Sequence, residues 1–112
     1  MEASKSRVVI DYSKLGDELV EQIKLVYPYG FSQHLITFTN AQGLNVSALR
    51  FETFEKIYLI RMTTQLAEKI IDEDTDYDDD GNLKDDIKEQ YEEEHADIEY
   101  LGENDNYEED ED

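Results

Sequence analysis

The division of charge along the chain is the feature that most limits what this sequence can fold into. The 112 residues carry a net charge of −20. Residues 1–71 hold 8 acidic and 8 basic side chains, whereas residues 72–112 hold 22 acidic side chains and only 2 basic ones, Lys84 and Lys88. The first part is balanced and apolar enough to fold, while the second repels itself and has little to bury. We therefore expect a charge-balanced domain over 1–71, followed by an acidic helix and tail over 72–112.

The acidic excess also limits the partners. A chain of net charge −20 is repelled by nucleic-acid phosphates, so direct nucleic-acid binding is not expected. A basic protein or a divalent cation is the natural partner of such a surface. The N-terminus lacks the apolar run of about 7 residues that a secretory signal needs, and no stretch approaches the roughly 20 apolar residues of a membrane span. These patterns predict a soluble cytoplasmic protein without membrane contact.

Within residues 1–71, the first half predicts one strand and one helix. The β-branched run at 7–12 is typical of a strand. Ser13 is placed to cap a helix that Pro28 ends. Apolar residues recur at the spacing of one helical face, at Leu15, Leu19, Ile23 and Val26. This stripe is typical of core packing.

The second half of that region predicts three strands and a second helix. The strands are expected at 35–39, 44–51 and 56–62, with a turn at 40–43 and room for a bulge at Leu49. The last strand is apolar on both faces, which indicates an inner strand. Thr63 or Thr64 can cap a helix over 65–71. The order β-α-β-β-β-α predicts an α+β fold, with a small antiparallel sheet of about four strands and helices packed on one face. Its core is thin, so we also expect a homodimer.

Helical spacing returns in the acidic segment. Leu83, Ile87, Tyr91 and Ile98 fall on one side, with His95 between the last two. A third helix with this narrow apolar stripe would be marginal alone and is expected to dock on the domain or on a second copy. His95, beside Glu94, is expected to be a solvated helix residue. From Gly102 onward the sequence is typical of a solvated tail.

Residues 76–87, DYDDDGNLKDDI, begin like a calcium-binding EF-hand loop. Asp76, Asp78 and Asp80 occupy ligand positions 1, 3 and 5, Gly81 the turn, and Asn82 the position that supplies a backbone carbonyl. Position 12, however, is Ile87, which cannot supply the bidentate carboxylate. Two interpretations remain: a weak divalent-cation site, with calcium as its cofactor, or an acidic turn that enters a docked helix. We favour the turn.

No catalytic constellation stands out. His34 and His95 are the only two histidines, there is no cysteine, and the 5 glycines form no phosphate-binding loop. The acidic region does contain tyrosines among its carboxylates, at positions 77, 91, 100 and 107. Such rings can anchor a partner while the carboxylates steer it. We therefore expect neither an enzyme nor a required cofactor.

Three segments carry a family resemblance: VVIDYSKL at 8–15, ITFTNAQG at 36–43 and IYLIRM at 57–62. With the acidic tail, they make the chain similar to a family of small acidic bacterial proteins of unknown function. Some of its members are labelled DNA primase, but this sequence has no zinc-ligand cysteines and no basic surface to support that label. The resemblance implies a complete protein and no specific residue roles.

The leading hypothesis is a non-enzymatic protein-interaction module. Its acidic C-terminal region would bind a basic protein surface, with Tyr91, Ile98 and Tyr100 as apolar anchors. The alternative is a calcium-binding module that uses Asp76, Asp78, Asp80 and Asn82.

Overall fold

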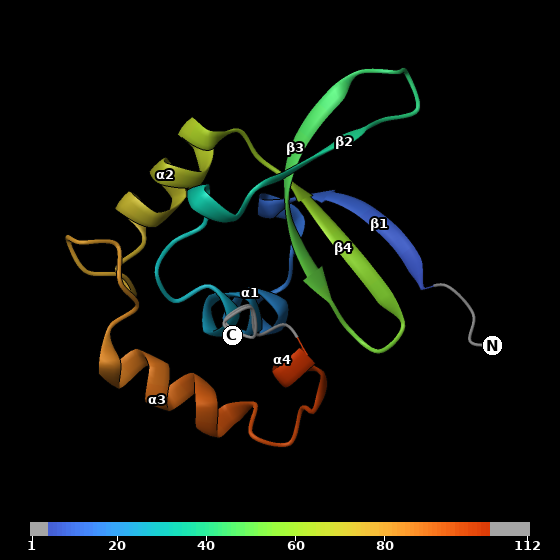
Figure 1. Ribbon diagram of the computed structural model, residues 1–112. Helices are drawn as coiled ribbons and strands as arrows, with labels where there is room; N and C mark the ends of the chain where they lie inside the picture. Colours follow the sequence, from blue (N-terminus) through green and yellow to red (C-terminus); the bar gives the residue numbers. More distant parts are fainter. Residues whose placement is uncertain (1–4, 104–112) are drawn as a thin grey trace, which may run out of the picture.

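The computed structural model describes residues 5–103 and contains one four-stranded sheet with its helices gathered on one side (Figure 1). The strands are β1 (Ser6–Asp11), β2 (Ile36–Thr39), β3 (Asn45–Glu52) and β4 (Lys56–Arg61). Their order in the sheet is β1-β4-β3-β2, so the strand that is apolar on both faces, β4, is an inner strand as predicted. The α+β class and the β-α-β-β-β-α order are confirmed.

The sheet is mixed, whereas the sequence led us to expect an antiparallel one. β2, β3 and β4 pair antiparallel through short turns, but β1 lies parallel to β4. A helical connection after β1 returns the chain across the sheet, so β2 runs in the same direction as β1. Two hairpin turns then reverse the direction twice, and β4 regains the direction of β1. The pairing of β3 is regular around Leu49, so the bulge does not form in the described strands.

Four helices complete the described chain, α1 (Asp17–Val26), α2 (Thr64–Glu73), α3 (Asp85–Glu94) and the short α4 (Tyr100–Glu103). Ser13 does not cap α1, because Tyr12–Lys14 forms a 3-10 turn and Gly16 is the N-cap residue. Thr63 does cap α2, accepting a hydrogen bond from the Leu66 N–H at 3.0 Å. The third helix is shorter than expected, and Ile98 lies beyond its end. No helix within residues 5–103 has the length and apolar character needed to cross a membrane.

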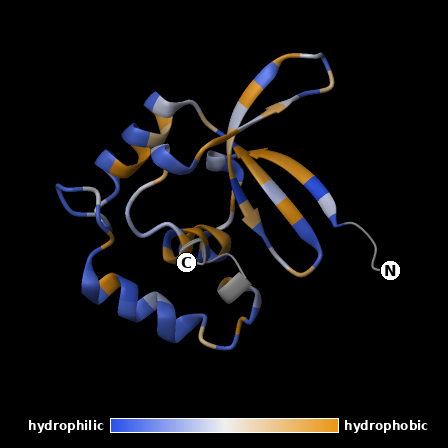
Figure 2. Cartoon of the chain, in the orientation of Figure 1, coloured by the Kyte–Doolittle hydropathy of each residue, from blue (hydrophilic) through white to orange (hydrophobic). Residues whose placement is uncertain are grey.

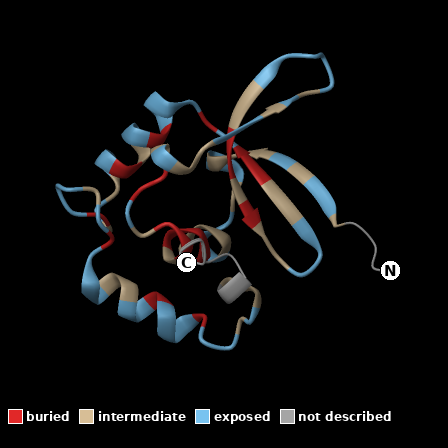
Figure 3. Ribbon diagram, in the orientation of Figure 1, coloured by how far each residue is buried: buried red, intermediate tan, exposed pale blue. Residues whose placement is uncertain are grey.

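The core lies between the sheet and the helices (Figure 3). Its largest fully buried side chains come from α1, the following loop, β3 and β4: Ile23, Phe31, Leu49, Phe51 and Ile60. Tyr77 and Leu83, from the acidic segment, belong to the same core. The predicted boundary at residue 72 therefore marks a change in charge but not in packing. Residues after 103, which include most of the predicted tail and Tyr107, lie outside the described range.

The opposite face of the sheet carries no helix of the described chain (Figure 1). Strand alternation and register place an apolar band there, made of Val9, Ile36, Phe38, Val46, Ala48, Ile57 and Leu59, of which Ala48 and Leu59 are already buried. Leu44, which directly precedes β3, adds to this band. Leu44 is 63% exposed and Val9 47%. Two ion pairs interrupt the band, one between Arg61 and Asp11 and one between Arg50 and Glu52. In the sheet, Arg61 lies opposite Ala48 and Arg50 opposite Leu59. We call this surface the open sheet face.

Candidate functional site

An acidic hollow opens between α2, the 29–33 loop and the turn at 78–81. Its volume is about 260 Å³. Its carboxylates come from two separate segments, Glu68 and Asp72 on α2 and Asp78, Asp79 and Asp80 on the turn, while Phe31, Ala67 and Ile71 supply apolar lining. The five carboxylate residues are exposed, and no ion pair among residues 5–103 involves them. This hollow attracts a cationic group and repels an anion.

Lys24 holds the acidic segment against α1. Its ammonium group lies 2.6 Å from a carboxylate oxygen of Asp74 and 2.8 Å from one of Asp76. The Lys24 side chain is only 8% exposed, and those of Asp74 and Asp76 are each less than 20% exposed. Burial of a charge is tolerated when opposite charges and hydrogen bonds compensate it, as they do here. The Lys24 ammonium group therefore fixes the position of Asp74 and Asp76, which lead into the turn that lines the acidic hollow.

Two tyrosines of the acidic segment complete this contact. The Tyr91 hydroxyl on α3 donates to Asp76 Oδ2 at 2.6 Å, so Asp76 bonds to α1 and α3 at once. The Tyr77 hydroxyl donates to the Tyr27 carbonyl at 2.9 Å, and its ring meets Phe31 edge to face. In both tyrosines the ring is buried and the hydroxyl group donates a hydrogen bond, which is the usual arrangement for a tyrosine in a protein interior.

The ionisation of these groups reflects their surroundings. Burial favours the neutral forms, but the bonds to Asp74 and Asp76 outweigh it and raise the pKa of Lys24. Burial likewise acts to raise the pKa of Asp76, yet the hydrogen bonds from Lys24 and Tyr91 bring it below its ordinary value. Burial, together with the neighbouring Asp76 carboxylate, raises the pKa of Tyr91 far above its usual range. At neutral pH the side chains of Lys24, Asp76 and Tyr91 are therefore an ammonium, a carboxylate and a neutral phenol.

The segment predicted as an EF-hand-like loop forms a tight turn. Asp78 Oδ1 accepts hydrogen bonds from the N–H groups of Asp80 and Asn82, and Tyr77 and Leu83 form an antiparallel bridge. Gly81 has φ of +83°, a conformation that glycine adopts without strain. Gly81 thereby allows the chain to reverse and enter α3.

The four predicted calcium ligands are not arranged around one point with their oxygens available. Asp76 is bonded to Lys24 and Tyr91, and the Asn82 carbonyl accepts the Asp78 N–H at 2.8 Å. Asp78 and Asp80 face the acidic hollow instead. A calcium ion at these residues would compete with the Lys24 ammonium, which already neutralises Asp76. Calcium binding at 76–87 stays a prediction that these contacts disfavour.

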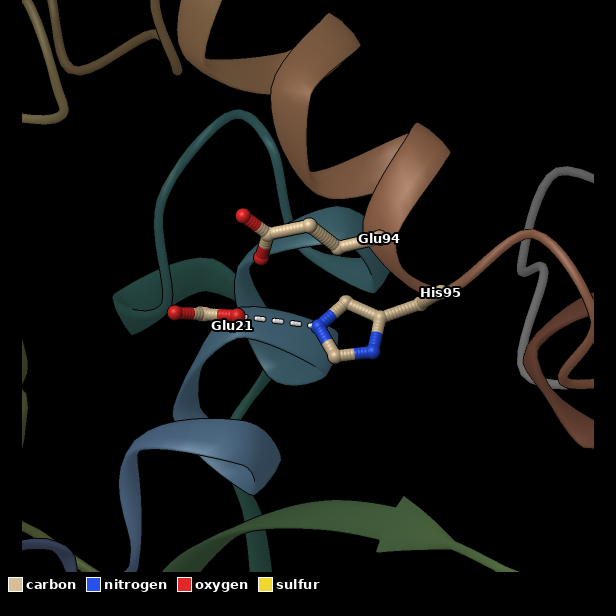
Figure 4. A group of neighbouring side chains, drawn as sticks. All are labelled: Glu21, Glu94 and His95. Atoms are coloured by element: carbon tan, nitrogen blue, oxygen red, sulfur yellow. Dashed lines mark hydrogen bonds and ion pairs between the residues drawn. The ribbon is translucent and has the colours of Figure 1, made fainter.

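A cluster of potential metal ligands lies elsewhere, where the end of α3 meets α1. Glu21, Glu94 and His95 each offer one ligand atom, and all three atoms lie within 4.8 Å of one another (Figure 4). His95 Nε2 is 2.9 Å from Glu21 Oε1. The expectation of a solvated His95 is wrong, because its side chain is only 5% exposed. His95 follows Tyr91 by one helical turn and is therefore on the face of α3 that packs against α1.

The residues predicted to anchor a partner contribute to packing within this chain. Tyr91 is buried, and its hydroxyl bonds to Asp76. The Tyr100 hydroxyl donates to Gln22 at 2.7 Å, and its ring packs against Phe51 and Phe54. Ile98 is half-buried. Tyr91 and Tyr100 would have to leave these contacts to bind a partner, so they are poorly placed as anchors.

Sequence reasoning missed Lys24, Glu21 and Tyr29. Lys24 lies beside the apolar stripe of α1, and nothing in the local pattern distinguishes it from a solvated lysine. Tyr29 is 66% exposed and lines the acidic hollow. The burial of His95 could have been predicted from its position four residues after Tyr91, because residues one helical turn apart share a face.

Comparison with known proteins found no matching family model, no matching curated protein and no matching solved structure. The resemblance to small acidic bacterial proteins therefore stays a prediction.

Proposed function

We propose that this chain is a non-enzymatic cytoplasmic interaction module whose acidic C-terminal region binds a basic protein. The acidic hollow carries the proposal. Carboxylates from α2 and from the 78–81 turn lie beside apolar side chains in this hollow. A lysine or arginine side chain fits such a site, because its cationic end can contact the carboxylates while its aliphatic part contacts the apolar residues. The exposed ring of Tyr29 at the rim adds a face for a cation–π contact.

The outer side of α3 extends the acidic surface. Its exposed carboxylates are Asp85, Asp86, Glu89, Glu92, Glu93 and Glu94. Figure 2 shows α3 as a mainly hydrophilic helix. Because Lys24 and Tyr91 fix the inner side of this region, the outward charges are held at defined positions. Such a surface speeds the encounter with a basic partner and orients it, while the hollow provides the specific contact.

The proposal predicts salt-sensitive binding that depends on the hollow. A fluorescent peptide rich in lysine and arginine should bind the full chain, with a Kd that rises roughly tenfold between low and physiological salt because screening weakens exposed charge pairs. Asp72→Asn combined with Asp79→Asn should weaken binding by about fivefold, as each substitution removes about 0.5 kcal/mol of attraction. Fluorescence anisotropy measures both effects.

A matched pair on α3 provides the control. Asp86→Asn combined with Glu93→Gln changes the net charge equally but does not touch the hollow, so binding should fall less than twofold. Equal losses for both pairs would show that diffuse charge, rather than the hollow, binds the peptide. A Kd that does not change with salt would contradict the proposal as a whole.

We further propose that a second copy of this chain covers the open sheet face. Two such faces can pack as a sandwich and bury both apolar bands. Elsewhere the acidic surfaces of two copies repel each other, but the open sheet face is not acidic. On this face the strands carry three basic residues, Arg7, Arg50 and Arg61, and two acidic ones, Asp11 and Glu52. Two chains of net charge −20 can therefore associate through this face with little electrostatic repulsion.

Sedimentation analysis tests this dimer. The wild-type chain should sediment as a dimer at micromolar concentration, and Val9→Lys with Ile36→Lys should make it monomeric by placing charge in the apolar band. Both residues are at least 40% exposed, so the monomer should stay folded. Leu66→Lys, at an exposed position on α2, is the control and should leave the dimer intact. A monomeric wild-type chain would rule out the second copy.

A further inference from the structure

We propose that Glu21, Glu94 and His95 form a binding site for a divalent transition-metal ion of the zinc type. The site would link α1 to the end of α3. It is separate from the acidic hollow and from the 76–87 turn, and it does not depend on the proposed function.

The geometry of the three residues supports a shared ion. Their ligand atoms lie within 4.8 Å of one another, and Figure 4 shows both carboxylates on the side of the imidazole where Nε2 lies. Ligands about 2.1 Å from one tetrahedral metal are roughly 3.4 Å apart. The longest of these separations therefore needs to contract by at most about 1.4 Å. Glu94 is exposed and the Glu21 side chain is 26% exposed, so both carboxylates have room to move.

His95 distinguishes this cluster from the many exposed carboxylate groups of the chain. Its side chain is 5% exposed, and the 2.9 Å contact with Glu21 orients Nε2 toward the carboxylates. A ligand held in place in this way loses little conformational entropy when the metal binds. Residues after His95 support this placement, since the Ile98 N–H donates to the His95 carbonyl at 3.1 Å.

The donor set determines which ion fits. One imidazole nitrogen favours zinc, cobalt or nickel over calcium and magnesium, which prefer oxygen ligands. Two carboxylates neutralise the charge of a divalent ion, and water can fill the fourth position. Glu94 accepts one hydrogen bond from Gln90 at 3.4 Å, a long contact that a metal bond can replace.

The site has a structural consequence. Glu21 and Lys24 are one turn apart on α1, and Tyr91 and His95 are one turn apart on α3. Lys24 and Tyr91 already meet at Asp76. A metal at Glu21 and His95 would add a second link on the next turn and hold the whole of α3 against α1.

Calorimetric titration of the untagged chain with zinc chloride tests the proposal. The buffer should contain excess magnesium, about 5 mM, to occupy sites made only of oxygen ligands. We expect one zinc ion per chain, a rise in melting temperature of about 5 °C or more at saturating zinc, and a shift of the His95 ring signals in NMR spectra. Cobalt should give the visible absorption of a site that includes nitrogen.

Variants separate this site from adventitious binding. Glu94→Gln should weaken zinc binding at least tenfold, and its exposure means that folding is not at risk. His95→Gln should abolish the stoichiometric site, whereas His34→Gln should leave it unchanged. Equal zinc affinity in wild type and Glu94→Gln would overturn the proposal, as would the lack of saturable binding below millimolar zinc. Peptide binding at the hollow is measured without zinc, so either proposal can fail alone.

Discussion

Replacing Lys24 with methionine is expected to lower the free energy of unfolding by about 3–5 kcal/mol, the usual effect of removing one partner from a buried ion pair. Methionine has nearly the same length, so the packing of the aliphatic stem is kept. The loss arises because Asp74 and Asp76 stay largely buried without the cation that neutralises them. Their mutual repulsion then favours release of the chain that leads to α3.

Urea denaturation at neutral pH, followed by circular dichroism, measures the effect. Lys69→Met is the control, because Lys69 is exposed on α2 and should change stability by less than about 0.5 kcal/mol. Adding Asp74→Asn and Asp76→Asn to Lys24→Met should restore part of the loss, since the unpaired negative charges are removed. Equal stability of Lys24→Met and Lys69→Met would show that the Lys24 contact contributes nothing.

Raising the pH above 10 is expected to destabilise the fold steeply. Burial raises the pKa of five tyrosines above the ordinary value for a tyrosine, about 10, and for Tyr77 and Tyr91 the increase is the largest. In the unfolded chain these phenols ionise near pH 10, while the folded chain keeps them neutral. The contribution of these phenols to the free energy of unfolding is therefore fully present below pH 10. It is lost as the pH rises toward their pKa values in the folded chain. The raised pKa of Lys24 acts in the same direction.

Each fully protected tyrosine adds about 1.4 kcal/mol of destabilisation per pH unit above its unfolded pKa. Urea midpoints between pH 8 and about 11.5 test this dependence. The sequence has no tryptophan, so tyrosinate absorbance reports ionisation directly.

Two single substitutions make the alkaline test specific. Tyr91→Phe should lower the free energy of unfolding at neutral pH by about 1.5–3 kcal/mol, because the hydrogen bond to the charged Asp76 carboxylate is lost. The same substitution should reduce the slope of stability against pH above 10. Tyr29→Phe should change neither quantity, because Tyr29 is 66% exposed. If the midpoint stays constant up to pH 11, these phenols are not protected by the fold.

Much of the secondary structure could be predicted from local pattern. The β-branched runs, the Asn40–Gly43 turn and the Thr63 cap each act through neighbouring residues, and each is present in the structure. The Ser13 cap was wrong because three residues after Asp11 form a 3-10 turn before α1 begins. The parallel pairing of β1 and β4 was missed because it depends on the direction of a crossover and not on the composition of either strand.

The candidate site was harder to predict than the fold. Asp78 and Asp80 were identified as part of an acidic turn, but their neighbours in the hollow, Glu68 and Asp72, come from a different helix. The sequence predicted that a helix of the acidic segment would dock on the domain or on a second copy, but it did not show which residues would enter the core. In the structure, Tyr77 and Leu83 belong to the common core. The acidic residues between them in the chain are therefore held close to the domain.

By itself the sequence determined the order of the elements, the division of charge at residue 72 and the tight turn at Gly81, because periodicity, composition and glycine conformation act over a few residues. Only the tertiary structure decided that Lys24 is buried between Asp74 and Asp76, and that Glu21 meets His95. These partners are about 50 to 74 residues apart in the chain. Their pairing depends on how α3 packs against α1, and a lysine or histidine becomes a defined site only when that packing removes it from water.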